Sequence, residues 1–231
     1  MPIQLHACDL TVPVTECVRP ADDTCYSKHL VELEQMLEHA MSHVDKYAHV
    51  KGGLQFRVPP LVHATLPKGG KTTFLLHLFD RLKCAGYASI LVSLCNLVSV
   101  MPGETDRQKL VRSIATQFVG GVSSDQLAWL TIDEDILWEH IETTRAGKCV
   151  ILLIDELHQL SLPLDGHASQ MLKELWLDKM GRYFVFTANV PLKTDAPRQK
   201  ASRTLQCIDL NKYREVVILK PSQLLETIMF L

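Results

Sequence analysis

The sequence predicts an α/β domain, in which a mainly parallel β-sheet is covered by helices on both faces. Short apolar runs alternate along the chain with longer segments of helical periodicity, the order typical of βαβ units. Two of these runs, residues 87–96 and 149–154, carry no charged side chain, as expected of strands buried on both faces. The 231 residues, 47% of them hydrophobic, are enough for one such domain with additions.

The first 53 residues precede the alternating pattern. Residues 1–26 contain several prolines and little periodicity, which predicts an extended or loosely ordered arm. In residues 27–50 apolar side chains recur at spacings of three and four, which predicts an amphipathic helix. The simpler interpretation is that its apolar stripe docks on the core of its own chain. Alternatively, the stripe pairs with a helix of a protein partner.

Residues 54–231 form one predicted domain in which strands and helices alternate. The expected strands are residues 61–66, 87–96, 149–154, 183–187 and 215–219. The expected helices are residues 72–86, 106–119, 133–144 and 169–180, with a last one starting at residue 222. A polar, basic loop is expected at residues 193–203.

A glycine-rich turn, Thr65–Thr72, joins the first of these strands to the first helix of the domain. It reads T-L-P-K-G-G-K-T. Its glycines allow a phosphate to approach the backbone, Lys71 would reach the β- and γ-phosphates, and the Thr72 hydroxyl would bind Mg²⁺. The positive end of the following helix would face the phosphates. The candidate nucleotide-binding residues are Pro67, Lys68, Gly69, Gly70, Lys71, Thr72 and Thr73.

Two carboxylates follow the most apolar of the expected strands. Asp155 and Glu156 stand at its carboxyl end, the edge at which parallel sheets carry their sites. Asp155 is the second candidate magnesium residue and would hold the ion through water. Glu156 is a candidate catalytic residue that would orient and deprotonate an attacking water.

Two further catalytic candidates lie beyond this acidic pair. Asn189 ends the apolar run that starts at residue 183, and either Asn189 or Thr187 could contact the γ-phosphate and the water. Asn189 could equally cap the loop that follows. Arg203 belongs to the basic loop, the region from which an arginine finger would come, although a solvated loop is the simpler interpretation.

These segments resemble the additional-strand P-loop ATPases, the group that contains the AAA+ and STAND proteins. The matching residues are Gly70–Thr72, Ile154–Glu156 and Thr187–Asn189. The resemblance implies a three-layer P-loop NTPase with a five-strand sheet in which the Walker A strand lies beside the sensor strand. It also implies ATP and Mg²⁺ as ligands. Residues 153–158 and 181–191 further resemble P-loop proteins of the Crinkler and retrotransposon-hot-spot type from eukaryotic microbes.

Two features depart from the family pattern. Thr65 stands where the Walker A motif begins with glycine, and a β-branched residue resists positive φ. The helical lid that usually follows the last strand is expected to be absent or reduced to residues 222–231. Because Glu156 favours catalysis over simple binding, the leading hypothesis is still ATP hydrolysis coupled to a conformational change. The alternatives are a nucleotide-binding switch or scaffold with weak or no hydrolysis, and an interaction module whose P-loop has decayed.

Composition limits the remaining classes. The formal net charge is −2 and the pI about 6.5, so no basic excess indicates a nucleic-acid partner. The seven cysteines form no C-x-x-C pair, which favours free thiols in a reducing compartment. No secretory signal and no membrane-spanning segment is expected, and we expect a cytoplasmic or nuclear location.

Overall fold

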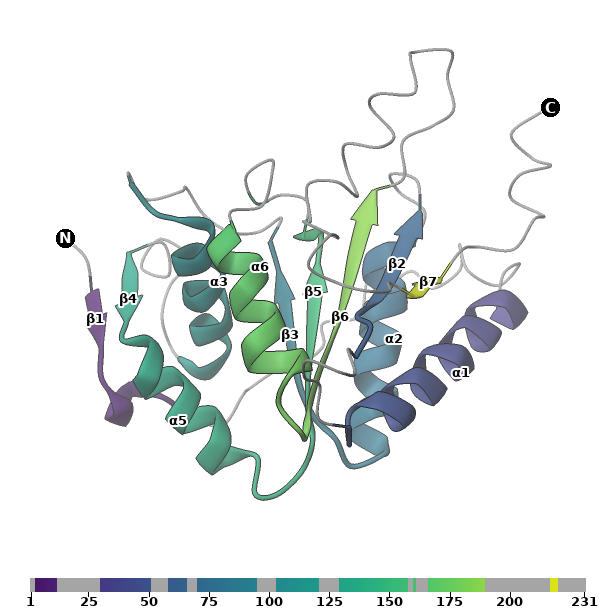
Figure 1. Ribbon diagram of the computed structural model, residues 1–231, viewed down its shortest axis with the longest axis horizontal. Helices are drawn as coiled ribbons and strands as arrows, with labels where there is room; N and C mark the ends of the chain where they lie inside the picture. Colours follow the sequence, from purple (N-terminus) through teal and green to yellow (C-terminus); the bar gives the residue numbers. More distant parts are fainter. Residues whose placement is uncertain are drawn as a thin grey trace, which may run out of the picture.

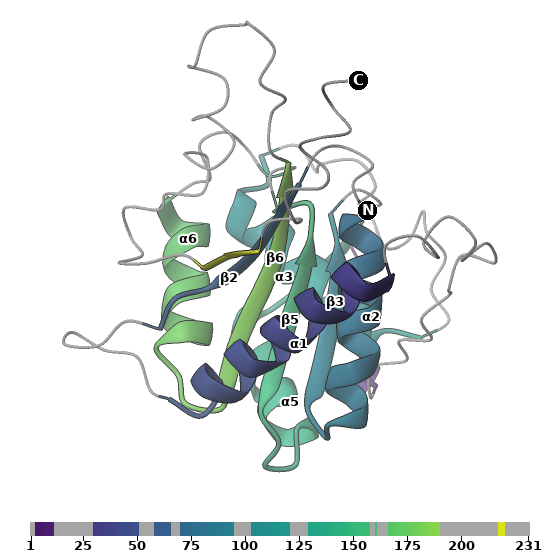
Figure 2. The ribbon, with the colours of Figure 1, turned by 90° about the vertical axis from the view of Figure 1, so that its right-hand side faces the viewer.

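The computed structural model describes residues 3–11, 30–50, 58–65, 70–94, 103–120, 129–157, 160, 166–189 and 217–219. Within them the chain forms a three-layer α/β structure, with a five-stranded sheet between two layers of helices (Figures 1 and 2). The predicted fold class is confirmed.

Every neighbouring pair of strands in the sheet is parallel, so all the carboxyl ends meet at one edge. The spatial order is β3-β5-β6-β2-β7. β2, the strand expected to lead into a Walker A turn, therefore pairs with β6, the expected sensor strand, which is the neighbourhood that the resemblance implies. The strands are β2 (Leu61–Thr65), β3 (Ala88–Ser93), β5 (Val150–Asp155), β6 (Arg182–Asn189) and β7 (Val217–Leu219).

Helices from different parts of the chain cover the two faces (Figures 1 and 2). On one face lie α1 (Leu30–Tyr47) and α2 (Lys71–Cys84), and on the other lie α3 (Asp106–Ala115) and α6 (Gly166–Leu172), with α5 (Glu134–Thr144) packed against α3. This double cover explains why all of β5 is buried. Two expected helices end irregularly: α3 continues as a 3₁₀ turn, Thr116–Phe118, and α6 as a π-helical turn, Lys173–Leu177.

The apolar stripe of α1 packs against the core of its own chain. Leu37, Ala40 and Val44 are buried in the same core as the sheet, and α1 contacts α2. The amide of Gly181 donates to the carbonyl of Ala48 just after the helix, at 2.9 Å. The docked alternative is thus the one observed, and a protein partner for this helix stays a prediction. The expected domain boundary at residue 53 lies outside the described residues.

Residues 3–11 of the expected arm are attached to the domain. β1 (Ile3–Leu5) pairs in parallel with β4 (Leu130–Ile132), forming a two-stranded sheet beside α5. The amide of Thr11 also donates to the carbonyl of Phe118 at 2.6 Å. This pairing could not be predicted from the sequence because three-residue strands are too short to show an alternating pattern.

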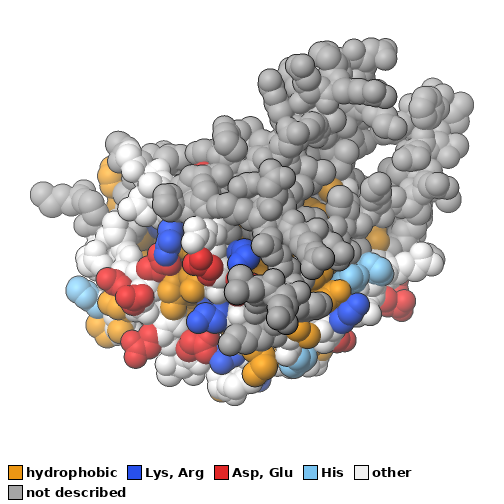
Figure 3. Space-filling view, in the orientation of Figure 1, with side chains coloured by type: hydrophobic (Ala, Val, Ile, Leu, Met, Phe, Trp, Pro, Cys, Tyr) orange, Lys and Arg blue, Asp and Glu red, His pale blue; other side chains and the backbone are white. Residues whose placement is uncertain are grey.

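Positive and negative side chains are interspersed on the described surface that Figure 3 presents. In the part of the chain that the structure describes, no helix combines the length and apolar character needed to cross a membrane.

Candidate functional site

The amino end of α2 lies at the carboxyl edge of the sheet and begins with a left-handed glycine. Gly70 is the N-cap residue of α2 and has φ 77° and ψ 16°, a conformation that glycine adopts without steric cost. Because glycine has no side chain, nothing at the cap position competes for the first amides of the helix. Lys71 follows directly and is 5% exposed. The end of α2 thus has the features of an anion-binding helix terminus.

Three hydroxyl and carboxylate groups join α2, β5 and β6 at this edge. The Thr72 hydroxyl donates to Oδ2 of Asp155 at 2.7 Å, and the Thr187 hydroxyl donates to Oδ1 of the same carboxylate, also at 2.7 Å. The structure therefore brings together the two predicted magnesium residues, which are far apart in the sequence. Asp155 is 3% exposed and Thr187 is fully buried, so the carboxylate is held from both sides in a protected position.

Glu156 adopts a strained backbone conformation at the end of β5. Its φ is 56°, and left-handed residues other than glycine are uncommon and tend to occur at functional sites. Its amide donates to the Thr187 hydroxyl at 2.7 Å. One side chain on β6 thus positions both acidic residues. The sequence offered Thr187 as an alternative contact for the γ-phosphate, but its burial and hydrogen bonds indicate a positioning role instead.

The remaining predicted site residues are described only in part. Thr73 lies in the first turn of α2, and the backbone of Asn189 ends β6, paired in register with Thr65. The side chain of Asn189 lies outside what the structure describes. So do Pro67, Lys68, Gly69 and Arg203, together with the expected lid at residues 222–231, and their roles stay predictions.

The structure shows that threonine can occupy position 65, where the family motif has glycine. This residue is the last of β2, and its backbone is extended by pairing with β6. β-Branched residues are favoured in strands, so threonine is compatible with this position. Positive φ is needed later in the turn, at Gly70.

The residues at this edge fit a magnesium ion by the chemistry of their donor atoms. Mg²⁺ prefers oxygen ligands, and the site presents the Thr72 hydroxyl and the Asp155 carboxylate. The Thr72 proton is directed to Asp155, which leaves the lone pairs of the threonine oxygen available to a cation. The buried carboxylate supplies the matching negative charge.

We expect Thr187→Val to lower the free energy of unfolding by about 1–3 kcal/mol. The substitution keeps the shape of the side chain but deprives the buried Asp155 carboxylate and the Glu156 amide of a hydrogen-bond partner. Urea unfolding of the wild-type and variant proteins measures the effect. The control is Thr187→Ser, which keeps the hydroxyl, and equal losses for Val and Ser would contradict the positioning role.

The fold is that of a P-loop NTPase, as the strand order and the Thr72–Asp155 contact indicate. No protein-family profile and no curated protein sequence matches the chain. Among solved structures, it is similar to Aeropyrum pernix Orc1 in complex with DNA, with 16% identity and a TM-score of 0.45 over 82% of this chain and 45% of that one.

Two other solved structures show similarity at the same low level. Cdc6p from Pyrobaculum aerophilum has 16% identity and a TM-score of 0.45, over 90% of this chain and 52% of that one. The Thermotoga maritima RuvB Holliday junction branch migration motor has 14% identity and a TM-score of 0.36, over 83% and 45%. This chain thus spans about half the length of the structures it matches. Similarity this low carries no argument about function.

Proposed function

We propose that this chain binds ATP with Mg²⁺ at the carboxyl edge of its sheet and hydrolyses it. The observation that carries the proposal is the 2.7 Å hydrogen bond between Thr72 and Asp155. It joins the start of the phosphate-binding helix to the carboxylate that ends the central strand, the two places from which a P-loop site recruits its magnesium residues. ATP is the nucleotide that the family resemblance implies, and GTP is the comparison ligand.

Phosphate binding follows from the amino end of α2. Backbone amides beyond Gly70 would donate to the phosphate oxygens, in line with the helix dipole. Lys71 would add a positive charge at the β- and γ-phosphates. Because Lys71 lies at 5% exposure, its interaction with a phosphate would be screened less by water and salt than that of a surface lysine.

Thr72 and Asp155 would hold the magnesium ion, the threonine directly and the aspartate through water. The bound ion would neutralise negative charge on the β- and γ-phosphate oxygens. Thr187 would keep the Asp155 carboxylate oriented through its hydrogen bond to Oδ1. The first step that this chain's residues perform is thus to bind and orient the triphosphate.

Hydrolysis would depend on Glu156. Its carboxylate would accept a hydrogen bond from the attacking water and then its proton. The left-handed turn at Glu156 makes the chain leave β5 abruptly, and the Thr187 hydroxyl fixes the amide of the same residue. A base in a fixed position is what general-base catalysis of this step requires.

The direct test is equilibrium binding of ATP to the wild-type chain with and without magnesium. We expect saturable binding of one ATP per chain in the presence of Mg²⁺, and weaker binding after the ion is removed with EDTA. Isothermal titration calorimetry measures both. Folded protein that binds neither ATP nor GTP with Mg²⁺ would overturn the proposal and support an interaction module with a decayed P-loop.

A further inference from the structure

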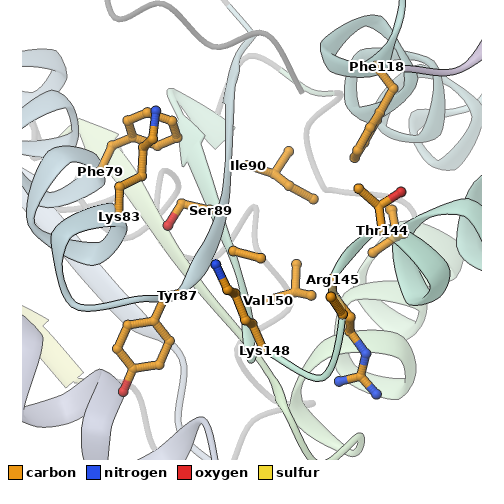
Figure 4. A pocket seen from close by; sticks show the side chains of 13 residues that line it. Phe79, Lys83, Tyr87, Ser89, Ile90, Phe118, Thr144, Arg145, Lys148 and Val150 are labelled. Atoms are coloured by element: carbon orange, nitrogen blue, oxygen red, sulfur yellow. The ribbon is translucent and has the colours of Figure 1, made fainter. Parts of the chain in front are cut away.

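A hollow lies at the amino end of the sheet, opposite the carboxyl edge that carries the candidate nucleotide site. Its volume is about 270 Å³, and it opens along β3, the end strand of the described sheet, between α2 and the end of α5 (Figure 4). The first residues of β3 and β5 line it, so it is separated from the carboxyl edge by the length of the strands. Apolar side chains from α2, from β3 and from the 3₁₀ turn after α3 form its walls, among them Phe79, Ile90 and Phe118.

The charged side chains that line this hollow are all positive: Lys83, Arg145 and Lys148. Arg145 is paired with Glu142 at 2.6 Å, and in Figure 4 its guanidinium points away from Ser89. The ammonium of Lys148 points toward Ser89 and has no hydrogen-bond or ion-pair partner in the described part of the chain. The hollow therefore keeps positive charge that the described residues do not neutralise.

Tyr87, which also lines the hollow, does not reduce its positive charge. Burial, together with a hydrogen bond to Asp45, raises the pKa of Tyr87, so its phenol stays neutral. The ammonium of Lys83 lies 5.2 Å from the centre of the Phe79 ring, a cation–π contact that leaves its charge unchanged.

Ser89 presents hydrogen-bonding groups to the hollow. Its hydroxyl is buried and has no hydrogen-bond partner among the described residues, which is uncommon in a folded protein. The amide of Ala88 donates to the carbonyl of Cys149, and backbone groups of alternate residues in a strand point to opposite sides. The amide and carbonyl of Ser89 therefore point away from β5, at the edge of the described sheet. Ser89 thus offers a hydroxyl and a backbone amide beside the ammonium of Lys148.

We propose that this hollow binds a small organic anion, a carboxylate carried on an apolar or aromatic body. Lys148 and the donors of Ser89 would hold the carboxylate, and Phe79, Ile90 and Phe118 would contact the apolar part. The volume of about 270 Å³ lies just below the range of about 300–1,000 Å³ usual for drug-sized ligands, which favours a small molecule.

A peptide added as a further strand fits less well. It would need the outward backbone groups of at least Ser89 and Leu91, and Leu91 does not line the hollow. The site is separate from the proposed ATP site, so its binding can be tested without nucleotide.

The test uses two probes that differ only in charge, 4-phenylbutyrate and 4-phenylbutan-1-ol, added to the full chain without nucleotide. We expect the acid to bind saturably, to shift the backbone amide resonance of Ser89, and to bind about tenfold more tightly than the alcohol. Lys148→Met should weaken binding of the acid about tenfold, because it keeps the aliphatic stem and removes the charge. Lys148→Arg should retain the affinity.

The matched control is Lys179→Met, which removes an exposed charge near the same end of the sheet but outside the lining of the hollow. Its affinity for the acid should equal that of the wild type. Equal binding of acid and alcohol, or equal losses for the two methionine variants, would overturn the proposal. A short peptide that displaces the acid and shifts Leu91 and Ser93 as well would overturn it in favour of strand addition.

Discussion

Lys71→Met is expected to abolish measurable ATP binding at micromolar nucleotide while leaving the protein folded. Lys71 is buried at the start of α2, where its ammonium would meet the β- and γ-phosphates. Loss of a charge-assisted hydrogen bond costs about 1.5–3 kcal/mol, or roughly 10–150-fold in Kd. The low exposure of the site places the expected effect at the upper end of this range, because water screens the lost interaction little.

Calorimetric titration of wild type and variant with Mg·ATP measures the change, and the thermal unfolding midpoint confirms the fold. Methionine is preferred to alanine because it fills most of the volume of the lysine stem. Lys46→Met, which removes an exposed charge from α1, is the matched control and should bind as the wild type does. Unchanged affinity in Lys71→Met would mean that the phosphates bind elsewhere on the chain.

The core of this site was predictable because the carboxyl ends of parallel strands meet at one edge. If residues 61–66 and 149–154 are parallel strands of one sheet, Thr72 and Asp155 are expected at the same edge. The observed 2.7 Å hydrogen bond confirms that reasoning. The neighbouring position of β2 and β6 followed from the family resemblance, since periodicity alone carries no information about strand order.

Other features depend on three-dimensional contacts that leave no local pattern. The role of Thr187 required knowing that β6 lies beside β5, which places its hydroxyl between the Asp155 carboxylate and the Glu156 amide. The positive φ at Glu156 could not be predicted from the sequence either, because glutamate has no preference for that conformation. At Thr65 the missing glycine suggested a weakened loop, whereas the structure keeps this residue as the last of β2, inside the strand expected at residues 61–66.

The hollow beside β3 illustrates the same limit. Its lining comes from the ends of α2 and α5 and from the starts of two strands, segments that share no sequence motif. Lys83, Arg145 and Lys148 look like ordinary surface charges in the sequence. Their gathering around one hollow follows only from the packing of both helical layers at the edge of the sheet, and of the three it is Lys148 whose ammonium points toward Ser89.

Glu156→Gln is expected to reduce ATP hydrolysis at least about 100-fold and to leave ATP affinity within a factor of about two. General-base catalysis contributes roughly 10²–10⁴-fold, and glutamine keeps the size of the side chain without the ability to accept the proton. Steady-state phosphate release measures turnover, and calorimetric titration measures binding. Glu139→Gln, an exposed position on α5, is the control and should hydrolyse ATP at the wild-type rate.

The backbone strain at Glu156 provides an independent check on this assignment. Glu156→Gly removes the carboxylate and relieves the left-handed strain at φ 56°. We therefore expect a free energy of unfolding at least equal to that of the wild type, together with the same loss of hydrolysis. A residue kept only for stability would give the opposite result. If both Glu156 variants bind ATP and release phosphate as the wild type does, the catalytic role is wrong, and a nucleotide-binding switch becomes the better description of this chain.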